Sequence, residues 1–443
     1  MMTLPAPVAE ALVRLEHAGF EAYVVGGCVR DALMGKKPDD FDICTAATPA
    51  ETKSIFSDCS VLETGVQHGT VTVVIGGYFL EITTFRTESA YSDGRHPDSV
   101  TFTPSLREDL ARRDFTVNAM AYSPTSGLVD LFGGRQDIHN KIIRCVGNPI
   151  HRFTEDALRI LRALRFASVL NFSIDAPTTE AAKNLSHRLA MVSEERIAVE
   201  LKKAVVGDGF PEILMSFPSV FAEFLPELAP CDGYDQNNPH HAFDLLSHLS
   251  KTVSFLPKDP ILRLSGLLHD IGKPLTCSTD ENGICHYYGH AAKGSEMASK
   301  ALKRLKFSTK EIERVTTLIR YHDGVIEENE RAVKHRIHQL GNEKFLDLLA
   351  LQRADHASQT ENPNYRKSHD DMIFHIGMNI ISNSECTNTN QLAINGYDMI
   401  NLGVCGKEIG KILKILLFAV MDGKVENEKS ALLSYAQSHL KMS

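Results

Sequence analysis

The sequence has no hydrophobic run that approaches the ~20 residues needed to span a bilayer, and its N-terminal segment lacks the apolar core of a secretory signal. Its nine cysteines do not follow the spacing of a disulfide framework, which favours free thiols in a reducing cytosol. Internal repeats and low-complexity tracts are also absent. These absences predict a cytoplasmic protein with no membrane partner.

Positive charge is scarce relative to negative charge. Lysine and arginine number 47 against 56 aspartates and glutamates, which gives a formal net charge of −9. This balance argues against nucleic acid wrapping the whole surface, although it leaves room for a local basic cleft. The 443 residues are 43% hydrophobic and 23% charged, as in folded proteins, and this length predicts about two to four domains.

Strand signals are confined to the first third of the chain. The runs "AYVVGG", "GTVTVVIGG", "YFLEITTF" and "SVTFTP" are rich in β-branched and aromatic residues, and the middle two predict a hairpin that turns at Gly76 and Gly77. From about residue 150 onward the spacing is helical, with Thr154 and Ser193 as expected N-caps. The fold class predicted is α+β, with a small mixed sheet followed by a long helical region.

The stretch "YVVGGCVRDALMGKKPDDFDICTAATP" predicts a phosphate-binding turn. A strand ends at Gly26 and Gly27, and a helix follows. Glycines let the backbone approach an anion closely, and the free N–H groups at a helix start point toward it. Arg30, in the first turn, can add a charged fork. A glycine pair alone is more often a simple turn.

Two carboxylates in the same stretch indicate a metal. Asp40 and Asp42 are two apart in an extended segment, so both project to one face. Carboxylate oxygens together with substrate phosphates suit Mg²⁺. Glu81, on the next β-type run, can supply a third carboxylate. The alternatives are a solvated acidic loop for the aspartates and an exposed strand residue for Glu81.

A polar stripe follows in "TEDALRILRALRF", where Asp156, Arg159, Arg162 and Arg165 lie along one side of a predicted helix. Cytosine and adenine both present an amine donor beside a ring-nitrogen acceptor, whereas uracil and guanine reverse that order. Aspartate only accepts and arginine only donates, so Asp156 with Arg159 matches C and A. The alternative is an amphipathic helix with a solvated charged face.

The motifs "GGCVRD", "DDFDICTAATP", "RRDFTVNAMAY" and "EDALRILRALRF", in this order over about the first 210 residues, resemble the class II nucleotidyltransferases. That family contains the tRNA CCA-adding enzymes and bacterial poly(A) polymerases. The resemblance implies a polymerase-β-like catalytic head in which Asp40 and Asp42 hold Mg²⁺. The nucleotide contacts that it implies come from Gly27, Arg30, Arg113, Arg162 and Arg165, with Glu155, Asp156 and Arg159 as a protein template.

Two further segments are similar to parts of CCA-adding enzymes. The polar stretch "FRTESAYSDGRHPDSVTF" resembles the flexible loop with which those enzymes switch from CTP to ATP. The C-terminal stretch that begins "INGYDMINLGVCGKEIGKILK" resembles the tail of bacterial CCA-adding enzymes. Its residues Lys407, Lys411 and Lys414 can contact the tRNA backbone or form a solvated helix face.

A second chemistry is indicated by "SGLLHDIGKP", which resembles the signature of HD metal-dependent phosphohydrolases, with His269 and Asp270 adjacent. The resemblance implies His248 and Asp355 as the other ligands of this HD site. Imidazole and carboxylate ligands together suit Mn²⁺, Ni²⁺, Fe²⁺ or Zn²⁺. His290 and His322 are candidates for a second metal position in the HD site. Lys273 is expected to bind a phosphate or to cap the segment.

The predicted function is addition of CCA to tRNA 3′ ends from CTP and ATP, with a metal-dependent phosphohydrolase activity in the HD domain. The alternatives are a poly(A) polymerase, an RNA-associated HD phosphodiesterase with an inactive head, and a non-catalytic RNA-binding scaffold. The oligomeric state stays open. The predicted domains are a catalytic head at 1–145, a neck with the nucleotide-selecting helix at 146–210, a body at 211–375 with the HD domain at about 240–360, and a tRNA-contacting tail at 376–443.

Overall fold

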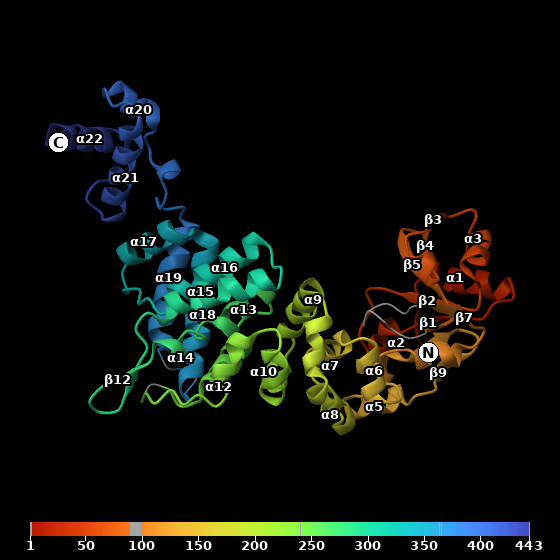
Figure 1. Ribbon diagram of the computed structural model, residues 1–443. Coiled ribbons are helices and arrows are strands. Elements are labelled where there is room, and N and C mark those ends of the chain that lie inside the picture. The colour runs from red at the N-terminus through yellow and green to blue at the C-terminus, as the bar shows by residue number, and fades with distance from the viewer. Residues whose placement is uncertain (1, 89–98, 240, 363, 365, 443) are drawn as a thin grey trace. The chain divides into compact units, whose positions relative to one another are not determined.

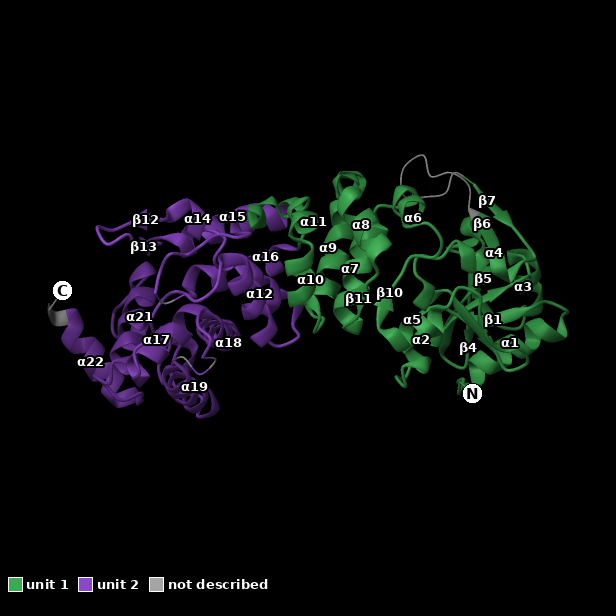
Figure 2. Ribbon diagram, turned by 90° about the horizontal axis from the view of Figure 1, so that it is seen from below, with its two compact units in different colours: residues 1–229, 304–307 green, residues 230–303, 308–443 purple. Residues whose placement is uncertain are grey.

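The computed structural model describes all residues except 1, 89–98, 240, 363, 365 and 443. The chain divides into two compact units, coloured green and purple in Figure 2. Unit 1 contains residues 1–229 and 304–307, and unit 2 contains residues 230–303 and 308–443. Within the described residues, no helix combines the length and the apolar character that a membrane crossing requires.

Unit 1 is built on a seven-stranded mixed sheet with the order β3-β4-β5-β2-β1-β8-β9. Neighbouring strands are antiparallel except β2 and β5, which run parallel. The bounds are β1 Ala22–Val25, β2 Asp42–Thr45, β3 Ser60–Leu62, β4 Thr70–Ile75, β5 Tyr78–Thr84, β8 Met120–Ser123 and β9 Gly127–Asp130. The β4–β5 hairpin turns at Gly76 and Gly77, both with positive φ, which confirms the prediction.

Alternate residues of these strands enter two separate cores, as the two-residue period of a strand requires. Val24 packs with residues of helix α1 (Ala6–His17) on one side of the sheet. Tyr23 and Val25 pack with Leu106 and Leu110 of α4 (Leu106–Ala111) on the other. The sheet is therefore covered on both faces.

The remaining elements of the sheet region are short. They are α2 Gly27–Leu33, α3 Pro49–Ile55, the 3₁₀ turns η1 Val66–His68 and η2 Thr116–Asn118, and the ribbon of β6 Arg86–Glu88 with β7 Val100–Phe102. Residues 89–98, the centre of the predicted substrate-switching loop, lie outside the described residues. The prediction for that loop therefore stays a prediction.

Helices complete unit 1 after the sheet (Figure 1). Their bounds are α5 Gly134–Asn140, α6 Pro149–Glu155, α7 Leu158–Leu170, α8 Ala176–Asn184, η3 Ser186–Met191, α9 Glu194–Val205, α10 Phe210–Ser216, α11 Pro218–Ala222 and η4 Pro226–Cys231, with a two-residue pair β10 Ile142–Ile143 and β11 Ser173–Ile174. Helices α7 and α9 pack closely through Ser168, whose hydroxyl donates to Ala204 O at 2.6 Å.

The expected N-cap at Thr154 is wrong. Thr154 lies inside α6, which Asn148 caps by accepting the Ile150 N–H at 2.8 Å. The chain leaves helical geometry at Asp156, with φ −141° and ψ 107°, and α7 begins at Leu158. The predicted stripe is therefore not on one helix, because Asp156 precedes the helix that carries the three arginines. Ser193 does stand at the N-cap of α9, although its side chain makes no capping hydrogen bond.

Unit 2 is almost entirely helical in its described part, as predicted from about residue 150 onward. Its bounds are α12 Leu245–Phe255, α13 Pro260–Leu268, α14 Lys273–Thr276, β12 Ser278–Thr279, β13 Cys285–His286, α15 His290–Arg304, α16 Thr309–Tyr321, α17 Glu330–Leu340, α18 Asn342–Gln359, α19 Lys367–Ser382, η5 Thr389–Gln391, α20 Gly396–Asn401, α21 Lys407–Met421 and α22 Lys429–Met442. Helices α12, α13, α16 and α18 pack against one another and bury Leu256, Leu262, Leu318 and Leu351. The predicted domain limits remain predictions.

Candidate nucleotide cleft and buried metal cluster

The glycine turn after β1 brings an arginine against the backbone. Gly26 has φ 84°, which favours glycine, and a Cβ there would lie 3.2 Å from Nη1 of Arg113. Gly27 begins α2, which carries Arg30. The turn therefore places Arg113 and Arg30 beside the same short stretch of backbone.

The carboxylates lie at the start of β2. Asp42 and Glu81 are direct partners in the parallel register of β2 and β5. Withdrawal from bulk water in the cleft and repulsion from Glu81 and Asp40 raise the pKa of Asp42, against the attraction of Arg113. Repelling carboxylates of this kind are stabilised by a divalent cation.

A polar chain links two of the predicted nucleotide-binding arginines. Arg30 Nη1 donates to Asn118 Oδ1 at 2.7 Å, and Asn118 Nδ2 donates to Asp114 Oδ1 at 3.2 Å. Arg162 lies 2.6 Å from Asp114 Oδ2 through Nη2. Arg162 and hydrogen bonds from Asn118 and the Phe115 N–H hold the pKa of Asp114 below its usual value, although burial acts in the opposite direction. Asp114 and Asn118 were not among the predicted site residues, although both belong to the motif "RRDFTVN".

Phe166 on α7 is surrounded by three guanidinium groups. Arg165, Arg30 and Arg162 lie 4.1, 5.2 and 5.4 Å from its ring centroid, within the range of cation–π attraction. Arg165 also pairs with the buried Glu200 at 3.1 Å. The ring therefore gathers the arginines on one side of the cleft.

The cleft has a volume of about 690 Å³ and joins these groups. Its lining includes both glycines of the turn, Asp40 and Asp42, and a basic wall, which consists of Arg30, Arg113, Arg162, Arg165 and Lys203. Acidic and basic groups thus face one space, which suits a metal-bound polyphosphate. Glu81 is adjacent to Asp42 but is not part of the lining.

Asp156 and Arg159 are held apart from each other. Asp156 pairs with Arg196 of α9 at 2.8 Å, and its other oxygen accepts the Leu158 N–H at 2.9 Å. The buried Arg159 forms an ion pair with Glu155 and donates to Arg152 O at 3.2 Å. Neither Asp156 nor Arg159 lines the cleft, unlike Arg162 and Arg165 on the same segment.

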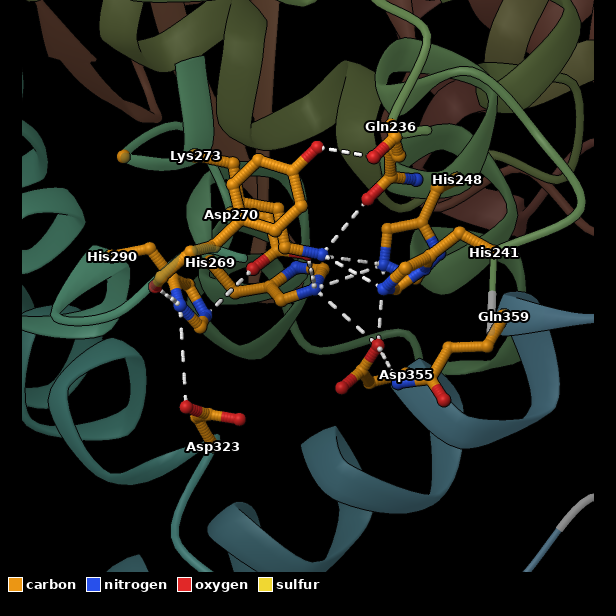
Figure 3. Close-up of polar contacts among 12 residues, drawn as sticks. Gln236, His241, His248, His269, Asp270, Lys273, His290, Asp323, Asp355 and Gln359 are labelled. Atoms are coloured by element: carbon orange, nitrogen blue, oxygen red, sulfur yellow. Dashed lines mark hydrogen bonds and ion pairs between the residues drawn. The ribbon is translucent and has the colours of Figure 1, made fainter. Parts of the chain in front are cut away.

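Unit 2 holds a buried cluster of histidines and aspartates, drawn in Figure 3. One group consists of His248, His269, Asp270 and Asp355, and a second consists of Asp270, His290 and His322. In the first, His248 Nε2 lies 3.2 Å from both His269 Nε2 and Asp355 Oδ1 and 3.4 Å from Asp270 Oδ2. These predicted residues come from three separate segments of the chain and lie within the reach of one cation.

Asp270 belongs to both groups through different oxygens. Its Oδ2 faces the first group, and its Oδ1 lies 3.2 Å from His290 Nε2 and 3.3 Å from His322 Nε2. This Oδ1 is buried without a hydrogen-bond partner of good geometry. A carboxylate oxygen left in this way among imidazole nitrogens fits a bridging ligand between two cations.

The ring orientation of each histidine is fixed from the other nitrogen. Nδ1 of His269, His290 and His322 lies 2.8, 2.7 and 2.6 Å from the backbone carbonyl three residues earlier. His248 Nδ1 lies 3.1 Å from Ser358 Oγ. Such contacts direct Nε2 toward the centre of the cluster, and contacts of this kind orient histidine ligands in known metal sites.

Ion pairing inside the cluster is strong. Despite burial, which acts in the opposite direction, His269 and Lys273 hold the pKa of Asp270 well below its usual range. Lys273 Nζ lies 2.7 Å from Asp270 Oδ2, 2.9 Å from Gln236 Oε1 and 3.3 Å from His241 Nε2. Burial and the Lys273 charge lower the pKa of His241 to about 3, so this imidazole is neutral. Lys273 therefore adds a positive charge beside the ligands of the cluster.

Family comparisons agree with both halves of the chain. Three models match: poly A polymerase head domain at residues 22–144, probable RNA and SrmB-binding site of polymerase A at 171–231, and putative tRNA nucleotidyltransferase domain 2 at 282–436. None of these three descriptions names an HD domain. The support for a metal site in unit 2 therefore comes from the buried cluster and from the motif "SGLLHDIGKP".

Relatives match over nearly the whole chain. A CCA-adding enzyme of Leuconostoc mesenteroides is 34% identical over 97% of this chain and 95% of its own length. One of Limosilactobacillus fermentum is 34% identical over 99% of both chains. The Bacillus stearothermophilus CCA-adding enzyme solved with CTP superposes with a TM-score of 0.73, at 28% identity over 99% of both chains. A Thermotoga maritima CCA-adding enzyme complexed with tRNA shares the fold, with a TM-score of 0.65 at 20% identity over 99% of this chain and 97% of that one. The chain belongs to the CCA-adding enzymes, the class II nucleotidyltransferases of tRNA.

Proposed function

We propose that the cleft of unit 1 binds CTP and ATP and joins their nucleotides to the 3′ end of tRNA as C, C and A. The observation that carries this proposal is the single cleft in which Asp40 and Asp42 face Arg30, Arg113, Arg162 and Arg165. In the reaction, the tRNA 3′-hydroxyl attacks the α-phosphate and pyrophosphate leaves.

The acidic and the basic side chains of the cleft have different roles. Asp40 and Asp42, with Glu81 beside them, would hold Mg²⁺, which when bound activates the attacking oxygen and neutralises the leaving group. The basic wall binds the triphosphate. Asp114, Asn118 and Phe166 hold three of its arginines, Arg30, Arg162 and Arg165, in place before the substrate arrives, which lowers the cost of gathering like charges. The glycine turn lets the nucleotide approach the backbone.

Base choice rests on Asp156 and Arg159. Asp156 accepts a hydrogen bond from the exocyclic amine and Arg159 donates to the ring nitrogen, which suits C and A. Because Asp156 is paired with Arg196 and Arg159 with Glu155, selection requires these side chains to exchange partners when a base enters. Rejection of U or G then follows from an unpaired buried edge, at about 1–3 kcal/mol.

The test uses a tRNA that lacks its terminal CCA, with CTP and ATP supplied together. Addition of three nucleotides supports the proposal. A long A tail would instead indicate a poly(A) polymerase. Incorporation that persists in the double variant D40A/D42A would place the chemistry elsewhere or reveal a contaminant.

We propose for unit 2 a second activity, metal-dependent hydrolysis of phosphoesters such as those at RNA ends. The buried cluster supports it, because His248, His269, Asp270 and Asp355 fit one Mn²⁺, Ni²⁺, Fe²⁺ or Zn²⁺, and Asp270, His290 and His322 fit a second. Such metals activate water for hydrolysis. Lys273 is placed to bind a phosphate oxygen at the cluster.

The test compares the double variant H269A/D270A with the parent protein on phosphomonoester and 2′,3′-cyclic phosphodiester substrates, with each metal added separately. Hydrolysis is expected to disappear while CCA addition continues. Equal hydrolysis by both proteins would remove the second activity. Loss of CCA addition as well would indicate a folding defect, so the variant's melting temperature is measured alongside.

A further inference from the structure

Two cysteines of unit 2 have their sulfur atoms in contact. Cys277 Sγ donates to Cys285 Sγ at 2.9 Å. Cys277 follows α14, and Cys285 begins β13 in the short antiparallel pair with β12. Cys277 is exposed and Cys285 is buried. Since a disulfide bond is ~2.05 Å long, only a small side-chain movement separates this contact from a bond.

The backbone around Cys285 is held firmly. Its N–H donates to Asn237 O at 3.0 Å, and its carbonyl accepts from Asn238 Nδ2 at 3.0 Å. Thr279 Oγ1 lies 3.8 Å from its sulfur. The hydrogen bond from Cys277 is the largest cause that lowers the pKa of the Cys285 thiol. The same hydrogen bond raises the pKa of the Cys277 thiol, so Cys285 is the favoured nucleophile of the pair, because the thiolate is the reactive form of cysteine.

We propose that Cys277 and Cys285 form a reversible redox site that a hydroperoxide converts into an intramolecular disulfide. One thiolate attacks the peroxide, so that an S–O bond forms, the O–O bond breaks and an alcohol or water leaves. The second thiol attacks this sulfenic acid, an S–S bond forms, and the hydroxyl leaves as water. Two thiols are oxidised by two electrons, the peroxide is reduced, and an external dithiol reverses the change.

The disulfide would close the segment that joins the two parts of the metal cluster. Lys273 begins α14, which ends just before Cys277. His290 begins α15, five residues after Cys285. Tyr287 Oη donates to Gln236 O at 2.5 Å, and the Gln236 side chain accepts from Lys273. The bond would therefore restrain the hairpin that lies against these residues. This inference is independent of any catalytic activity of the cluster.

The experiment treats the reduced full-length protein with stoichiometric hydrogen peroxide, then quenches, denatures and alkylates it. The nine alkylatable thiols are expected to fall to seven, and dithiothreitol is expected to restore nine. Cleavage at Asp280 or Glu281, between the two cysteines, should yield two peptides joined through Cys277 and Cys285. Hydrogen exchange of residues 278–286 should slow in the oxidised form.

Variants separate this pair from general thiol oxidation. In C277S, Cys285 should stop at a sulfenic acid that dimedone traps, with no linked peptides. In C405S, which removes another exposed cysteine, two thiols should still be lost. Oxidation spread evenly over Cys59, Cys277 and Cys405, or linkage only between separate chains, would overturn the proposal.

Discussion

Asp42 and Glu81 are direct neighbours across β2 and β5, the parallel pair of the seven-stranded sheet. Their repulsion contributes to the raised pKa of Asp42. Adjacent carboxylates that repel each other destabilise the folded protein, and a divalent cation bound to them would offset this cost. We therefore expect this pair to contribute to a metal site rather than to a solvated acidic surface.

The first prediction concerns these two residues. Asp42→Asn should reduce the turnover of CCA addition by about 100-fold or more, because a charged ligand for the metal is lost. Glu81→Gln should reduce it less and should lower the pKa of Asp42, since a repelling charge disappears. Initial rates on a tRNA without CCA, measured across pH and Mg²⁺ concentration, check both. Equal rates for D42N and the parent protein would contradict the assignment of Asp42.

The second prediction concerns the buried Asp114. Asp114→Asn removes the charge that holds Arg162 and should destabilise the protein by about 1–3 kcal/mol, a range that allows for the partial exposure of Arg162. It should also raise the KM for CTP and ATP more than it lowers kcat, because Arg162 of the basic wall loses the ion pair that orients it. Glu180→Gln, which removes the charge of an exposed acidic side chain of α8 outside the cleft lining, serves as a control.

Asp114 should also make the free energy of unfolding depend on pH. Because the pKa of Asp114 is lowered in the folded protein, its stabilisation is fully present above the unfolded value of about 3.9 and is lost as the pH falls through the folded value. The difference in unfolding free energy between parent and D114N should therefore be constant from about pH 5 to 7 and shrink below about pH 4. Denaturant unfolding at several pH values measures it. A difference that grows toward acid would be inconsistent with an ionised Asp114.

The third prediction concerns base choice. Asp156→Ala should narrow the preference for CTP over UTP by about 5- to 150-fold, the equivalent of about 1–3 kcal/mol. Arg196→Ala frees Asp156 without removing it, so discrimination should survive while thermal stability decreases. Single-nucleotide incorporation with each of the four triphosphates gives the ratios. A D156A variant that keeps the parental ratio would exclude Asp156 as the base reader.

The fourth prediction concerns the metal cluster. Because Asp270 faces both groups, Asp270→Asn should lose all metal from the cluster, whereas His322→Ala should lose only the cation of the second group. Elemental analysis of purified protein, with the exposed His375→Ala as control, counts the ions. Chelation should lower the melting temperature of the parent protein but not of D270N, because a ligand at 100 times its Kd stabilises the folded state by about 2.7 kcal/mol. Equal metal content in D270N and the parent would place the ions elsewhere.

Local features of the sequence were sufficient to predict several of these site residues. The glycine turn, the Asp40–Asp42 spacing and the His269–Asp270 pair are each contained in a few residues, and their chemistry follows from residue type. The hairpin at Gly76 and Gly77 was predictable for the same reason, since its turn residues need positive φ.

Other relations depend on contacts between distant segments. The pair of Asp114 with Arg162 spans 48 residues and that of Asp156 with Arg196 spans 40, and neither leaves a local pattern. The helix break at Asp156 was missed because the apolar spacing continues across it. The Asp156 carboxylate instead accepts the Leu158 N–H, and this side-chain bond competes with helix continuation.

The measurement that tests the central claim most directly is a crystal structure of the full chain with CTP and Mn²⁺, in which anomalous scattering locates the ions. The account predicts manganese on Asp40 and Asp42, with the triphosphate against Arg30, Arg113, Arg162 and Arg165. Triphosphate density outside this cleft, with no ion at the two aspartates, would contradict it.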